Sequence, residues 1–369
     1  MKRQFLSSVL LAAFAAAVIP SAFVLAQTGT PAASKPSPAA SKPATGASKP
    51  APAAKTAKLW TGAKTPWGDP DLQGVWNDAT STPLQRPAGK GEAVLDEPQA
   101  DQFAEQLAND LTRDRRDGGN EVDVNRAYNE HWMDARRLKI TNDRRTSLIV
   151  DPPDGRMPPA VPISPERQKI RAERGAAAAR FNAGMPDVAT ELSLPIRCIV
   201  RTDSPPYLPT IYNNDFQIFQ SPGYVVIAPE MIHSARIIPL DNRPHLGPNL
   251  KQWLGDTRGH FEGNTLVIET TNFRTDDGTV YQGANPETYK ITERFTRVAD
   301  DTINYEFTID DPKTWTKPWT AVIPWNKIDP KEQMYEYMCH EDNFDIVHLL
   351  TGARAREKNP ALNLQPTKR

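Results

Sequence analysis

The sequence predicts a mainly β protein, an antiparallel meander that is curled or closed into a barrel, with two inserted helices and a short C-terminal helix. Residues 256–312 show the clearest alternation of apolar and polar side chains and indicate two successive β-hairpins. After Cys198, short strand-like segments follow one another closely, which favours an antiparallel meander over βαβ units. Because a meander leaves two unpaired edges, we expect the sheet to close on itself.

The first 58 residues predict export. Residues 1–26 begin with basic residues, continue with an apolar run and end in small residues, which is typical of a cleaved signal peptide; an uncleaved membrane anchor is the alternative. Residues 27–58 are rich in Ala, Pro, Ser and Lys, so we expect a disordered linker. We predict a periplasmic or extracellular location. The linker lysines allow a loose contact with anionic envelope surfaces, but a plain spacer is the favoured interpretation.

The charge of the remaining chain argues against one class of partner. The first 58 residues hold seven of the 44 Lys and Arg and none of the 45 Asp and Glu, which leaves 37 basic against 45 acidic side chains. Nucleic-acid binding is therefore not expected. We expect residues 59–356 to form a single barrel-like domain and residues 357–369 to form a flexible tail.

Strands and two helices are predicted before Cys198. The strand-like segments are residues 72–77, 127–134 and 145–150. A helix over 97–115 is indicated by apolar residues at helical spacing. A second helix over 164–181 has Ser164 as its N-cap and Pro165 in the first helical position.

Further strands are predicted after Cys198, at residues 215–220, 224–228, 232–238, 319–323 and 334–340, in addition to the two hairpins. Segment 224–228 is apolar on both faces, so we expect the inserted helices to cover the outer side of the sheet there. The C-terminal helix follows Asn343 as its cap and carries the apolar residues Phe344, Val347 and Leu350 on one stripe.

The first hairpin turns at Gly263-Asn264, a pair that favours the tight turns matching strand twist. This turn places Phe261 opposite Leu266 on an apolar face. His260 and Glu262 alternate on the other face and have the spacing of two metal ligands. Because that face is the polar one, we interpret them as solvated rather than as a metal site.

The second hairpin has a predicted three-residue loop at 299–301, which places Phe295 opposite Tyr305 and Glu293 opposite Phe307. Glu293 therefore lies on the apolar face. A carboxyl there is expected to have a raised pKa and to serve as an acid, a base or a ligand anchor. The alternative is a structural carboxylate that pairs with an inward arginine.

Two arginines and one histidine are the candidate neighbours of Glu293. Arg236 and Arg297 are the possible ion-pair partners. His233 and Arg236 stand three residues apart, so a regular strand directs only one of them inward. A buried histidine with no catalytic role is the more common outcome.

The two cysteines, Cys198 and Cys339, are predicted to form a disulfide that ties the middle of the domain to its last strand; two free buried thiols are the alternative. His340 shares a face of that predicted strand with Glu336. The two residues are a candidate acid–base pair, and a surface pair without function is equally compatible with the spacing.

Two resemblances extend this interpretation. The strings LPTIYNNDFQI, WLGDTRGHFEGNTLVIETTNF, YEFTIDDPKTWTKPW and CHEDN resemble those of a large, uncharacterised family of exported bacterial proteins. That resemblance spans about residues 60–356 and implies no activity, substrate or catalytic residue. Gly74-x-Trp76 on the first strand, together with a helix after the last strand, resembles the calycins, whose lipocalin-like barrel is closed by an aromatic plug.

Three functions follow as hypotheses. The first is an exported barrel that binds a small apolar or aromatic ligand in its interior. Its candidate ligand-binding residues are Arg236, Arg297, Tyr305 and Phe307. The second is a cofactor-free lyase, isomerase or hydrolase with Glu293, His233 and His340 as catalytic residues, and the third is a structural or partner-binding envelope protein. No metal-binding, phosphate-loop or nucleophile motif stands in the sequence, so we predict neither a metal nor a cofactor.

Overall fold

The computed structural model describes residues 62–111, 134, 139–201, 204–210, 212–232, 234–274, 281–329, 331–332 and 334–362. The predicted signal peptide, the linker, His233 and all of the predicted strand 127–134 except Asp134 lie outside these ranges. No helix in the described part combines the length and the apolar composition needed to cross a membrane.

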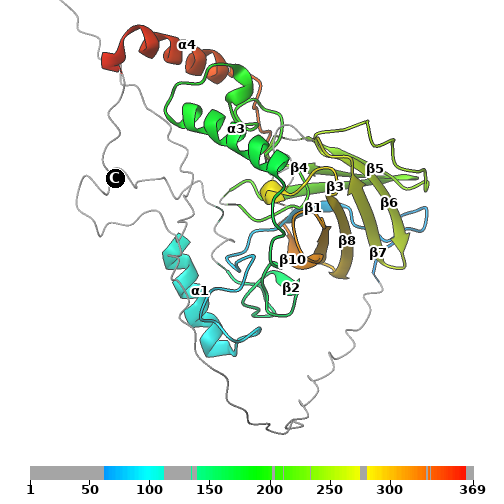
Figure 1. Cartoon of the computed structure of the whole chain (residues 1–369). Coiled ribbons are helices and arrows are strands. Elements are labelled where there is room, and N and C mark those ends of the chain that lie inside the picture. The colour runs from blue at the N-terminus through cyan, green and yellow to red at the C-terminus, as the bar shows by residue number, and fades with distance from the viewer. Residues whose placement is uncertain are drawn as a thin grey trace, which may run out of the picture. The chain divides into compact units, whose positions relative to one another are not determined.

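The described strands form one antiparallel sheet that rolls into a nearly closed barrel (Figure 1). The strand order is β5-β4-β3-β1-β10-β9-β8-β7-β6, and β2 pairs with β10 beside this path. The strands are β1 (Gly74–Asn77), β2 (Ile149–Asp151), β3 (Asp215–Ser221), β4 (Tyr224–Pro229), β5 (Arg236–Pro239), β6 (Asp256–Glu262), β7 (Thr265–Thr271), β8 (Lys290–Ala299), β9 (Thr302–Asp310) and β10 (Trp319–Lys327). The predicted fold class is confirmed.

The two hairpins have the predicted register. Phe261 lies opposite Leu266 in the β6–β7 pair, and Glu293 lies opposite Phe307 in the β8–β9 pair. One detail of the second turn differs from the prediction. Ala299 pairs with Thr302 and is not part of the loop, and the register shifts at a bulge between Arg297 and Ala299.

The barrel interior is filled by large side chains. The inward residues of β8, β9 and β10 include Phe295, Tyr305, Phe307, Trp319 and Trp325, none of which is exposed to solvent. Their rings contact one another, with centroids of Phe295 and Tyr305 4.8 Å apart and those of Tyr305 and Trp325 5.2 Å apart. Tight packing of this kind leaves the interior as a core. This packing disfavours the first hypothesis, in which a ligand lies inside the barrel.

The outer face of β3, β4 and β5 remains exposed. Phe219, Val226 and Ile237 form a row of cross-strand neighbours on that face. Phe219 is 46% exposed and Ile237 is 65% exposed. The expectation that the inserted helices cover this side is wrong, because the helices are anchored elsewhere.

Three α-helices occur in the described residues, as expected: α1 (Glu97–Leu111), α3 (Pro165–Asn182) and α4 (Asp345–Lys358). α1 buries Ala100 and Phe103 in a small separate cluster. α3 begins as predicted, because Ser164 Oγ accepts a hydrogen bond from the backbone N–H of Arg167 at 3.3 Å. Side chains of α4 donate to backbone carbonyls just after α3, which holds the two helices together.

Residues 334–340 are not a strand, which corrects the prediction for the last strand. The reason is that β10 already pairs with β9 along one edge and with β1 and β2 along the other, so it has no free edge for a further strand. The predicted disulfide is present, with Cys198 Sγ and Cys339 Sγ 2.08 Å apart. It joins two irregular segments rather than the middle of the domain and a strand. Phe344 and Val347 of the predicted apolar stripe are exposed, and in α4 only Ala353 is buried.

Candidate functional site

Glu293 lies in the barrel interior, fully buried, and is held by an arginine across the barrel. Arg236 Nη2 donates to Glu293 Oε2 at 2.6 Å and Arg236 Nη1 donates to Oε1 at 3.1 Å. Tyr305 Oη donates to Glu293 Oε1 at 2.9 Å. Burial alone would lower the pKa of Arg236, but the charge of Glu293 raises it, so the guanidinium stays charged. This geometry is that of a structural ion pair, the second of the two interpretations of Glu293.

Arg236 has further partners that fix the network in place. Its Nη1 donates to Tyr207 Oη at 3.0 Å and its Nη2 donates to Thr270 Oγ1 at 3.2 Å. The backbone N–H of Tyr207 donates to Tyr305 Oη at 3.2 Å. Burial, and then the charge of Glu293, raises the pKa of Tyr305 well above its usual range, so its hydroxyl remains a donor.

Two other residues predicted for this site, Arg297 and Phe307, are not part of the hydrogen-bond network around Glu293. Arg297 does not contact Glu293; its guanidinium donates to the carbonyls of Asp71, Ala299 and Asp300 at 2.7, 3.2 and 2.6 Å. Phe307 packs among the aromatic side chains of the core. Both side chains are buried.

His340 lies at the surface in an irregular segment. Because that segment is not a strand, His340 and Glu336 do not share a strand face, and the argument for an acid–base pair from strand alternation is wrong. His260 and Glu262 lie on an exposed face, as expected, with His260 Nε2 and Glu262 Oε1 3.1 Å apart.

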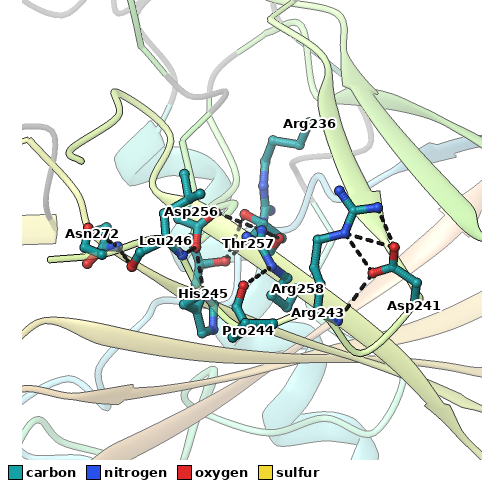
Figure 2. Close-up of polar contacts among 12 residues, drawn as sticks. Arg236, Asp241, Arg243, Pro244, His245, Leu246, Asp256, Thr257, Arg258 and Asn272 are labelled. Atoms are coloured by element: carbon teal, nitrogen blue, oxygen red, sulfur yellow. Dashed lines mark hydrogen bonds and ion pairs between the residues drawn. The ribbon is translucent and has the colours of Figure 1, made fainter.

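His245, for which the sequence gives no functional signal, contacts a buried carboxylate. His245 Nδ1 lies 2.8 Å from Asp256 Oδ2, and Arg258 Nη1 donates to Asp256 Oδ1 at 2.7 Å (Figure 2). The backbone N–H of Leu246 also donates to Asp256 Oδ2 at 2.8 Å. Asp256 thus ties the loop after β5 to β6. No sequence spacing links His245 to Asp256, because the contact joins a loop to the strand after it.

Carboxyl groups gather where β1 and β4 end and β3 begins. Asp78 follows β1, its side chain is fully buried, and no described residue forms a hydrogen bond with either of its carboxyl oxygens. Asn77 Nδ2 donates to Asp134 Oδ2 at 2.8 Å and to Asp215 Oδ1 at 2.6 Å. Burial, and then the charges of Asp134 and Asp215, raises the pKa of Asp78 well above its usual range. Asp78 therefore keeps its proton to a higher pH than an exposed aspartate does.

A cleft of about 390 Å³ lies outside the barrel, at the N-terminal end of α3. Its lining residues are Ala160, Val161, Pro162, Ile163, Ser164, Arg167, Arg171, Gly283, Asn285, Lys313 and Thr314. Residues 160–163 are apolar, and three of the other lining residues are cationic. This volume is in the range of small-molecule sites, roughly 300–1,000 Å³.

Hydrogen bonds connect the segments that form the walls of the cleft. The backbone N–H of Val161 donates to the carbonyl of Thr314 at 2.9 Å. The backbone N–H of Asn285 donates to the buried Asp311 Oδ2 at 2.6 Å and to Thr314 Oγ1 at 3.1 Å. The sequence holds one signal for this site, since Arg167 and Arg171 are four residues apart on a predicted helix and share a face. Nothing in the sequence indicates that the distant segments near residues 284 and 314 also line the cleft.

Comparisons with protein-family models, with curated proteins and with solved structures found no match for this chain. The resemblances to a family of exported bacterial proteins and to the calycins therefore stay predictions. Within the described residues, no group of three or more His, Cys, Asp or Glu is arranged to hold a metal ion.

Proposed function

We propose that the protein is an exported binding protein that takes up a small, largely apolar or aromatic molecule in the cleft beside α3. The observation that carries this proposal is the cleft itself, which has an apolar wall at residues 160–163 and a volume suited to a small ligand. The Cys198–Cys339 disulfide supports the export part of the proposal, because disulfides persist in oxidising compartments.

The arrangement of Glu293 favours this binding role over the enzyme hypothesis. A general acid or base must reach the substrate, whereas Glu293 is fully buried and its carboxylate is occupied by Arg236 and Tyr305. The barrel then serves as a rigid support for the loops and for the helix that line the cleft.

Filling the cleft tests the proposal. Ala160→Trp adds a large ring to the apolar wall, and we expect it to weaken the binding of neutral 2-naphthamide by about tenfold or more, because a displaced aromatic ligand loses most of its buried area. Isothermal titration calorimetry measures the affinity. Ala178→Trp, at an exposed position on α3 outside the cleft, is the matched control and should bind like the wild type. Equal binding by all three proteins would contradict the proposed site.

A further inference from the structure

Three cationic side chains line the polar side of the cleft. Arg167 and Arg171 come from the first turns of α3, and Lys313 comes from the loop between β9 and β10. The two arginines lie on one helix face, and both reach toward the same backbone segment. Arg167 Nη2 donates to the carbonyls of Gly283 and Ala284 at 3.2 and 3.0 Å, and Arg171 Nη2 donates to the carbonyl of Gly283 at 2.9 Å.

These contacts fix the guanidinium groups without neutralising them. In the part of the chain that the structure describes, neither Arg167 nor Arg171 forms an ion pair with a carboxylate. Lys313 does have an acidic partner, Glu287 Oε2 at 2.9 Å, but both side chains are exposed, so that pair is weak. The buried Asp311 is occupied by the N–H groups of Asn285 and Lys313.

The side chains that line the cleft include three cationic residues and no acidic one. Burial, and then the charges of Arg171 and Arg174, lowers the pKa of Arg167, while Asp311 and Glu287 act in the opposite direction and do not reverse the shift. The N-terminal end of the 18-residue helix α3 adds its partial positive charge at the same place. The two arginines thus offer hydrogen-bond donors to an acidic group of a ligand. The apolar wall beside them offers a surface to the apolar part of the same ligand.

We propose that the ligand of this cleft carries a carboxylate, which binds Arg167 and Arg171 while its apolar or aromatic body lies against residues 160–163. This inference rests on the proposed function and adds the chemical class of the ligand, a small aromatic or aliphatic acid. The carboxylate forms with the two arginines the ion pair that no described carboxylate forms with them.

The test compares two ligands of one shape. 2-Naphthoate and 2-naphthamide differ in charge and share the same ring system, so we expect the wild-type protein to bind the acid about tenfold more tightly or better. The preference should shrink as salt is added, because screening weakens the attraction between partly exposed charges. Titration calorimetry at low and high salt measures both effects.

Variants that remove or keep a positive charge test whether the preference for 2-naphthoate arises in the cleft. We expect Arg171→Gln to remove most of the preference for 2-naphthoate over 2-naphthamide. Arg171→Lys, which keeps the charge, should retain part of the preference even if the glutamine variant is impaired in folding. Lys169→Gln, at an exposed position of the same helix outside the cleft, is the matched control for loss of one positive charge.

The outcomes separate this inference from the proposed function. If both ligands bind equally and Ala160→Trp weakens both, the carboxylate inference is wrong while the binding site stands. If neither ligand binds, the proposed function fails and this inference fails with it. A preference for the acid that survives Arg171→Gln and Arg167→Gln would also overturn the inference.

Discussion

Glu293 and Arg236 neutralise each other in the barrel interior, where an unpaired charge would be strongly unfavourable. Glu293→Gln removes one charge and leaves the guanidinium of Arg236 buried without a counterion, since both side chains are almost fully shielded from water. We expect this variant to lose about 3 kcal/mol or more of unfolding free energy. Urea unfolding followed by tryptophan fluorescence measures the change.

The double variant Arg236→Met with Glu293→Gln is the control for this prediction. It removes both charges, and Gln can still accept the hydrogen bond from Tyr305, so the double variant should be more stable than Glu293→Gln alone. A Glu293→Gln protein as stable as the wild type would show that the ion pair is not structural and would return Glu293 to the list of functional candidates.

Asp78 is a buried carboxyl for which the described residues supply no hydrogen-bond partner. Its pKa is raised in the folded state, so the folded protein binds more protons than the unfolded one between about pH 4, the usual pKa of aspartate, and the raised value. The unfolding free energy therefore falls as the pH rises through that window. Asp78→Asn cannot ionise, so we expect it to be more stable than the wild type at neutral pH, by about 1.4 kcal/mol for each unit of pKa shift that the window covers.

Unfolding curves between pH 4 and pH 8 test this sign. The unfolding free energy of Asp78→Asn should decline less with rising pH than that of the wild type. The unfolding free energies of the two proteins should converge toward pH 4. Asp101→Asn, at an exposed position of α1, is the matched control and should follow the wild type. A loss of stability in Asp78→Asn at neutral pH would contradict this prediction.

At the scale of elements, the sequence was informative wherever neighbours in the chain are neighbours in space. The register of β6–β7 follows from Gly263-Asn264, and the start of α3 follows from Ser164 and Pro165. Each of these features is decided by a few adjacent residues through turn or cap geometry. The alternation of residues 290–310 in the same way places Glu293 on the buried face.

Elements that depend on distant partners could not be predicted in this way. Residues 334–340 have strand-like composition but cannot pair with β10, because β1 and β2 fill its second side. The partner of Glu293 proved to be Arg236 rather than Arg297, a choice made by strands far apart in the sequence. The cleft has the same origin, since its lining residues come from three separate regions of the chain.

At the scale of the whole molecule, closure of the barrel depends on the approach of β5 to β6. These are the two ends of the strand order, and no backbone ladder joins them in the described residues. Gly259 of β6 lies where the two strands meet. A Cβ atom added there would lie 2.6 Å from Ile238 Cγ2 and 3.1 Å from Leu240 Cδ2, which is closer than packed atoms tolerate. The absence of a side chain at Gly259 therefore lets β5 pack against β6 across the seam.

Gly259→Val tests this account of closure. The added side chain must push Ile238 and β5 away from β6, and we expect a loss of about 1–3 kcal/mol of unfolding free energy, as for other overpacked cores. The backbone amides of β5 should also exchange hydrogen faster, since the strand keeps only its β4 neighbour. Gly247→Val is the matched control, because a Cβ at Gly247 meets no atom within 4 Å and should leave exchange in β5 unchanged. Unaltered exchange and stability in Gly259→Val would show that the barrel holds its shape without the seam.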